Sequence, residues 1–155
     1  MIAIVKRAVT LIISFLLAVG LVAIISNYCC ILISNTNSLP QHYFLHCHKS
    51  SPKLNDYSVT WSNWYGDRVI KKIVGIAGDS VWYNQKGELM VNDQLIGVPQ
   101  KIASDGRALN PIQPQTIPEG LVFLAAEHPK SFDSRYQEFA LVPTTKLEGL
   151  VIPLL

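Results

Sequence analysis

The chain opens on a long apolar run. Residues 8–25, AVTLIISFLLAVGLVAII, carry no charge, and apolar residues resume at 29–33. About 20 such residues are enough to cross a hydrocarbon core as a helix. A cleaved secretory signal has a shorter apolar region followed by small cleavage-site residues, whereas here Ser26-Asn27-Tyr28-Cys29 follows. We therefore predict a transmembrane anchor over residues 8–33, with a cleaved signal as the less favoured alternative.

The remaining chain alternates short apolar, β-branched or aromatic runs with Gly, Pro and Asn breaks, which is typical of a mainly β domain. We expect strands near residues 80–83, 88–91, 120–125 and 147–152. Asn84–Gly87 reads as a hairpin loop and Asn92-Asp93 as the next turn. The stretch 108–119 contains three prolines and is predicted to be a surface loop. Repeats and a second domain are not evident.

The charge pattern orients the predicted anchor. Lys6 and Arg7 precede it, and the next lysine or arginine is Lys49, so the positive-inside bias predicts a cytoplasmic N-terminus at residues 1–7. Residues 34–155 then form an extracytoplasmic domain, in the periplasm of an inner-membrane protein. That domain holds all 11 acidic residues and 11 of the 13 basic ones, so it is formally neutral. Nucleic acid is therefore not an expected partner.

The cysteines and histidines raise the question of a metal. His46-Cys47-His48 looks like a ligand cluster, while Cys29 and Cys30 lie at the end of the apolar region. In an extended segment, however, Cys47 would point away from both histidines, so these three side chains cannot close on one ion. We predict no metal site.

Three segments carry the candidate chemistry. They are residues 35–43 (NTNSLPQHY), residues 69–79 (VIKKIVGIAGD) and residues 131–136 (SFDSRY). In this order, behind an anchor, they resemble the type I signal peptidase family, and within it the TraF-type conjugative-transfer peptidases that mature pilin precursors. The resemblance covers most of residues 30–155. It implies a catalytic core of coiled antiparallel sheets with one N-terminal helix.

A serine hydroxyl needs a neighbouring base before it can act as a nucleophile, and a Ser-His-Asp arrangement is not apparent around the four histidines. A lysine can be that base if burial lowers its pKa. On a strand, Lys71 would share its face with Val69 and Ile73, and Lys72 would lie on the opposite face. Alternation therefore does not decide which of the two lysines is the base, and the resemblance to the family selects Lys71.

The resemblance also assigns the remaining site residues. It implies that Ser38, in a turn before Pro40, is the nucleophile, and that its backbone N–H holds the tetrahedral oxyanion. Thr36 matches the residue that supplies a second oxyanion donor. A plain turn serine is the alternative for Ser38.

Near the C-terminus, Ser131 matches the family serine that hydrogen-bonds the lysine amine, and Asp133 with Arg135 match an acid and an arginine beneath the site. Alternate residues of a strand face the same way, so these three would line one face and orient Lys71. The alternative is an ordinary surface ion pair between Asp133 and Arg135.

These assignments imply a serine endopeptidase that works through an acyl-enzyme without metal or organic cofactor. Its partners would be exported precursors, pilins above all, and membrane lipid, on which Trp61, Trp64 and Tyr65 would rest. Core or ordinary surface positions are the alternative for these three rings. A general leader peptidase, a catalytically inactive scaffolding subunit of a conjugation apparatus and a self-cleaving repressor are the alternatives. The repressor fits the anchor poorly and lacks a DNA-binding segment.

Overall fold

The computed structural model describes residues 2–34 and 38–154. One long helix, α1 (Ile2–Ser26), opens the chain. Its segment Val9–Ser26 has a mean hydropathy of 2.8, and its side chains are not buried against the protein. This helix fits a single-pass membrane anchor. By internal contacts the chain divides into two units, Met1–Cys30 and Ile31–Leu155.

The helix ends earlier than the predicted anchor segment. Asn27 and Tyr28 donate backbone hydrogen bonds to Ile24 and Ile25, which closes the last turn. Strand β1 (Cys29–Ile33) follows, so the end of the expected segment 8–33 is extended backbone. Its backbone groups are used in a sheet instead of a helix.

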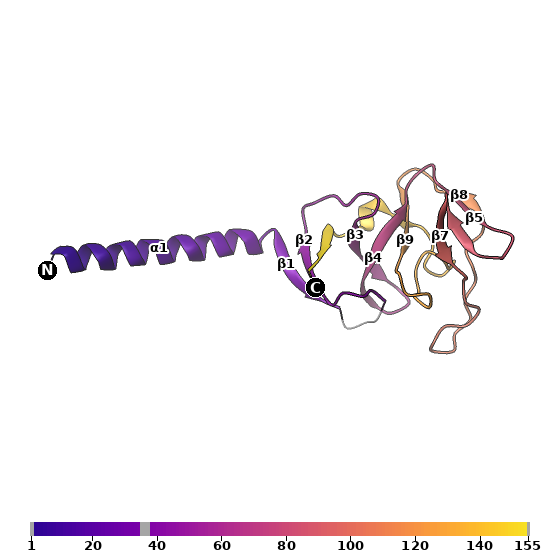
Figure 1. Ribbon diagram of the computed structural model, residues 1–155, viewed down its shortest axis with the longest axis horizontal. Helices are drawn as coiled ribbons and strands as arrows, with labels where there is room; N and C mark the ends of the chain where they lie inside the picture. The colour runs from indigo at the N-terminus through magenta and orange to yellow at the C-terminus, as the bar shows by residue number, and fades with distance from the viewer. Residues whose placement is uncertain (1, 35–37, 155) are drawn as a thin grey trace. The chain divides into compact units, whose positions relative to one another are not determined.

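Two sheets make up the β structure (Figure 1). The seven-stranded sheet has the order β1-β2-β11-β3-β4-β9-β10, and the four-stranded sheet the order β7-β6-β5-β8. The strands after β1 are β2 (Tyr43–Cys47), β3 (Tyr57–Ser62), β4 (Asp67–Gly75), β5 (Ser80–Tyr83), β6 (Leu89–Val91), β7 (Gln94–Gly97), β8 (Gln115–Thr116), β9 (Leu121–Ala125), β10 (Val142–Pro143) and β11 (Leu150–Pro153), with a 3-10 helix η1 (Thr144–Lys146) before β11. The mainly β fold class with one N-terminal apolar helix is confirmed.

The predicted strands agree with β5, β6, β9 and β11 to within a few residues. Strands β5 and β6 pair across the predicted hairpin loop, where the Asn84 side chain accepts hydrogen bonds from two backbone N–H groups. The predicted surface loop 108–119 contains two isolated bridges and β8, which pairs with β5. It is not wholly a surface loop, because Leu109, Ile112 and Ile117 are buried in the core.

Strand β4 positions the site because it lies between β3 and β9 and touches the core on both sides. Its Ile73 packs with Leu124 and other apolar side chains of one cluster, while Val74 belongs to another cluster with Phe123. Full burial of each such side chain stabilises the fold by about 1.5–3 kcal/mol. At Gly75 an added Cβ would lie 2.7 Å from the Ile117 side chain and 2.8 Å from the Val91 side chain, so glycine permits this close approach.

Candidate active site

Lys71 occupies the middle of β4, opposite Ser58 of β3. Its side chain is 2% exposed, which is unusual for a lysine. The Nζ atom donates a hydrogen bond of 2.6 Å to Ser131 Oγ. The structure thus brings together a buried lysine and a serine that are 60 residues apart in sequence.

Burial lowers the pKa of Lys71 from an ordinary 10.5 to about 8. Loss of hydration is the main cause, because it penalises the ammonium form. The carboxylate of Asp133 opposes this shift by favouring the charged form, and the positive charge of Arg135 adds to the shift. A substantial share of Lys71 is therefore neutral near physiological pH, and the neutral amine can accept a proton.

Lys72, the neighbouring candidate, lies in a different environment. It is half-buried, and its Nζ atom lies 5.9 Å from the centre of the Tyr57 ring. Of the two lysines, Lys71 is therefore the more strongly desolvated. Of the two apolar residues expected to share its face, Ile73 is buried and Val69 is half-buried.

Asp133 and Arg135 form an ion pair of 2.7 Å, and both side chains are 0% exposed. The Arg135 guanidinium also donates to the backbone carbonyls of Ala126, His128 and Pro129, while Asp133 accepts a hydrogen bond from the Ala126 N–H. A buried ion pair is tolerated when the remaining donors and acceptors are satisfied in this way. The expected alternative of a surface pair is wrong.

The segment that carries this pair is a turn, so the predicted strand at residues 131–135 is wrong. Tyr136 N–H bonds to the Asp133 carbonyl, and Ser134 Oγ bonds to the Leu124 N–H and the Ala140 carbonyl. These hydrogen bonds hold the segment in place of the interstrand backbone bonds of a β-strand. Ser131, Asp133 and Arg135 still lie together, because side-chain and turn hydrogen bonds gather them.

Ser38 lies in a half-buried turn. The next residue, Leu39, is 3% exposed and packs in a cluster with Val59 and Ala126, which ties the turn to β3 and the end of β9. The Ser38 carbonyl accepts a hydrogen bond of 3.3 Å from the His128 N–H. Thr36, the predicted second oxyanion donor, lies outside the described residues.

A continuous set of hydrogen bonds leads from this turn to the lysine. The His128 carbonyl accepts from the Ser131 N–H at 3.0 Å, and Ser131 Oγ accepts from Lys71. Segment 126–129 is therefore the bridge between the Ser38 turn and the buried Asp133–Arg135 pair. Sequence reasoning missed this role, since it is played by main-chain atoms that leave no signature in residue type.

A desolvated lysine that contacts a serine hydroxyl can act as the base that activates a hydroxyl nucleophile, which is the chemistry of acyl-transfer hydrolases. The chain matches the family model for signal peptidase, peptidase S26, over residues 1–154. The protein therefore belongs to this family of serine peptidases, which implies precursors that carry signal peptides as substrates.

One similar solved structure is a signal peptidase I from Enterococcus faecalis V583, which is 26% identical. The match covers 64% of this chain and 95% of that chain, with a TM-score of 0.42. No curated protein matches the chain.

Proposed function

We propose that the protein is a membrane-anchored endopeptidase that cleaves exported precursors with Ser38 as nucleophile and Lys71 as general base. The observation that carries this proposal is the burial of Lys71, at 2% exposure and with a pKa of about 8, in hydrogen-bond contact with Ser131. A base needs a pKa near the working pH, because it must be neutral before it can take a proton.

In the proposed reaction the neutral Lys71 amine takes the Ser38 hydroxyl proton as Oγ attacks the scissile carbonyl. The Ser38 backbone N–H and the Thr36 side chain hold the oxyanion. The resulting Lys71 ammonium then gives its proton to the leaving amine, which leaves an acyl-enzyme on Ser38. Water, activated by the same lysine, hydrolyses the ester and restores both residues.

Ser131, Asp133 and Arg135 are positioning residues in this proposal. Ser131 fixes the rotamer of Lys71 through the 2.6 Å hydrogen bond. The buried Asp133–Arg135 pair holds the segment 126–129, whose backbone contacts both the Ser38 turn and Ser131. The network therefore keeps base and nucleophile in register without entering the chemistry itself.

We further propose that residues 8–33 contain the anchor, residues 1–7 are cytoplasmic, and residues 34–155 are the periplasmic peptidase domain of an inner-membrane protein. The apolar helix and the preceding Lys6 and Arg7 support this orientation. A periplasm-active reporter fused after Leu155 should be active. Activity of a cytoplasmic reporter at the same position would contradict the orientation.

Contact with membrane lipid is supported by Trp61 and Tyr65, whose side chains are each 54% exposed. Trp64 differs, because it is half-buried, stacks on Phe132 with ring centres 4.4 Å apart and lies beneath the Arg107 guanidinium. The proposed lipid contact is therefore restricted to the two exposed rings, which favour the headgroup layer.

The substrate that we favour is a pilin precursor of a conjugation system. It is supported by the motifs around Ser38, Lys71 and Ser131 that resemble the TraF-type branch. Cleavage of a pilin precursor and of a general secretory precursor, each co-expressed with the enzyme, distinguishes this proposal from a general leader peptidase. Processing of the secretory precursor alone would refute the pilin assignment.

The dyad is tested by processing of a co-expressed precursor, followed by its change in mass. Ser38→Ala and Lys71→Ala should each abolish cleavage while the protein stays in the membrane fraction, because both remove the same step. Lys72→Ala is the matched control and should retain cleavage. Loss of activity in Lys72→Ala with retention in Lys71→Ala would show that the other lysine is the base.

A further inference from the structure

The segment that carries Ser131 also carries the centre of an aromatic group. Phe132, the next residue, is 4% exposed. It contacts the rings of Trp64, Tyr65, Tyr136 and Phe139. Trp64 stacks on Phe132 with ring centres 4.4 Å apart, and Tyr136 stacks on it with ring centres 5.8 Å apart. Because such stacks are favourable beyond the burial of apolar area, the ring contacts themselves hold Phe132 in place.

Arg107 extends this stack on the far side of Trp64. Its guanidinium carbon lies 3.5 Å from the centre of the Trp64 ring, and Asp105 holds the guanidinium in an ion pair. Arg107 and Phe132 both lie too close to the Trp64 ring to share one face, so they cover opposite faces. A continuous stack therefore runs from Arg107 through Trp64 to Phe132.

The hairpin of β3 and β4 holds the Ser131 segment at two points. Trp64 lies in the turn of this hairpin, and Lys71 lies in its second strand. Lys71 Nζ donates the 2.6 Å hydrogen bond to Ser131 Oγ, and Trp64 stacks on the adjacent Phe132. A single contact would leave the segment free to pivot about it. Two contacts at neighbouring residues fix its orientation against the hairpin.

A cavity of about 260 Å³ borders the stack. Its walls include Trp64, Phe132 and Tyr136. Because this space lies beside the rings, close packing does not hold Phe132 from every side, and the contact with Trp64 carries more of the restraint. Loss of the Trp64 ring would leave room into which Phe132 can move, and Ser131 would move with it.

We propose that Trp64 is a positioning residue for Lys71. Its ring holds Phe132, and the Phe132 segment in turn holds Ser131 Oγ at hydrogen-bond distance from Lys71 Nζ. This inference rests on the proposed function, in which Lys71 is the general base. Without the Trp64 ring the Lys71 amine would adopt other rotamers, and a displacement of about 1 Å at a reacting group can cost about 100-fold in rate.

Two variants of the full chain in detergent separate ring stacking from apolar burial, with a purified precursor that carries a signal peptide as substrate. Trp64→Leu should lower kcat about 10- to 100-fold with little change in KM, because Trp64 does not bind the substrate in this proposal. Trp64→Phe retains a flat ring and should keep most of the activity. Trp64→Met takes the place of Trp64→Leu if that variant is unfolded at the assay temperature.

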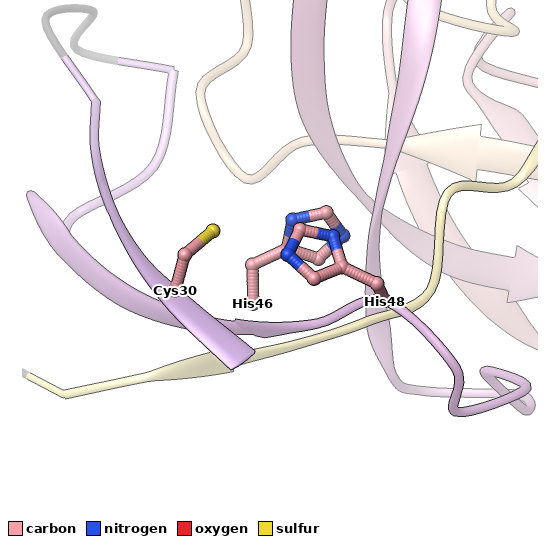
Figure 2. Close-up of side chains that lie close together, drawn as sticks. All are labelled: Cys30, His46 and His48. Atoms are coloured by element: carbon pink, nitrogen blue, oxygen red, sulfur yellow. The ribbon is translucent and has the colours of Figure 1, made fainter. Parts of the chain in front are cut away.

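His48→Ala is the control for the loss of a ring contact elsewhere in the domain. His48 directly follows β2, and its ring lies edge-on to that of His46 with ring centres 4.3 Å apart (Figure 2). Strands β11 and β3 separate β2 from β4 in the sheet. This variant should therefore cleave with the kcat of the wild type.

A double-mutant cycle with Ser131→Ala measures whether Trp64 acts through Ser131. If it does, Trp64→Leu should lower kcat by less than about twofold when residue 131 is already alanine. The proposal is overturned if Trp64→Leu cleaves with the kcat of the wild type, if its loss appears in KM instead of kcat, or if the two single losses multiply in the double variant. Cleavage by Lys71→Ala would refute the proposed function instead, so the two failures are distinguishable.

Discussion

Replacing Lys71 by methionine should abolish cleavage and at the same time stabilise the folded protein at neutral pH. The side chain is 2% exposed, and its pKa is lowered from 10.5 to about 8. A folded-state pKa below the unfolded-state value means that protonation favours the unfolded chain. The ammonium form of Lys71 is therefore a cost to folding that an apolar side chain of similar length removes.

The magnitude follows from the two pKa values. A difference of about 2.5 between 10.5 and 8 corresponds to about 3 kcal/mol. The hydrogen bond from Lys71 to Ser131 is lost in the variant, which offsets about 1 kcal/mol of the gain. Lys71→Met should thus gain about 2 kcal/mol at pH 7, or roughly 5–10 °C in Tm.

The pH dependence of stability shows whether the gain in Lys71→Met comes from removing the ammonium charge or from better packing. The wild type loses stability as the pH falls from 10.5 to 8, where the unfolded chain binds a proton that the folded one does not, and the loss is complete below that range. The advantage of Lys71→Met should therefore disappear at pH 11. Thermal unfolding of both proteins at pH 7 and pH 11 measures it, with Lys72→Met as the control. An equal difference at both pH values would refute the reasoning.

Two further predictions concern the residues around the lysine. Ser131→Ala should lower kcat about 10- to 100-fold with little change in KM, because the Lys71 side chain is then free to change its rotamer. Ser131→Thr should keep part of the activity. Equal kcat values for Ser131→Ala and the wild type would show that Ser131 does not position Lys71. Asp133→Asn leaves the Arg135 guanidinium buried without its counter-charge, so the folded state should be destabilised by about 3–5 kcal/mol. Thermal unfolding measures this loss. An unchanged Tm would mean that the pair is not buried in solution.

Much of the architecture could be predicted from the sequence, because its signals are local. The charge-free run predicts the helix, and the alternating runs around Asn84–Gly87 predict β5 and β6 with their hairpin. The end of the helix could not be placed, since the apolar residues of β1 satisfy a helix and a strand equally well. Tertiary pairing decides that boundary.

The candidate site shows the same division. Alternation puts Lys71 and Lys72 on opposite faces of β4 but does not say which face is dry, because that depends on β9 and the segment around Ser131, which are distant in sequence. The fully buried Asp133–Arg135 pair depends on tertiary contacts in the same sense. Residue types indicate such groups only after the fold has brought them together.

The central claim, that neutral Lys71 is the base, is tested most directly by the pH dependence of kcat/KM for precursor cleavage in detergent. The free enzyme with a lysine pKa of about 8 has roughly one-tenth of Lys71 neutral at pH 7, against about one part in 3,000 for a pKa of 10.5. The rate should rise with pH and level off above a pKa of about 8. A rate that keeps rising to a pKa near 10.5 would contradict the claim.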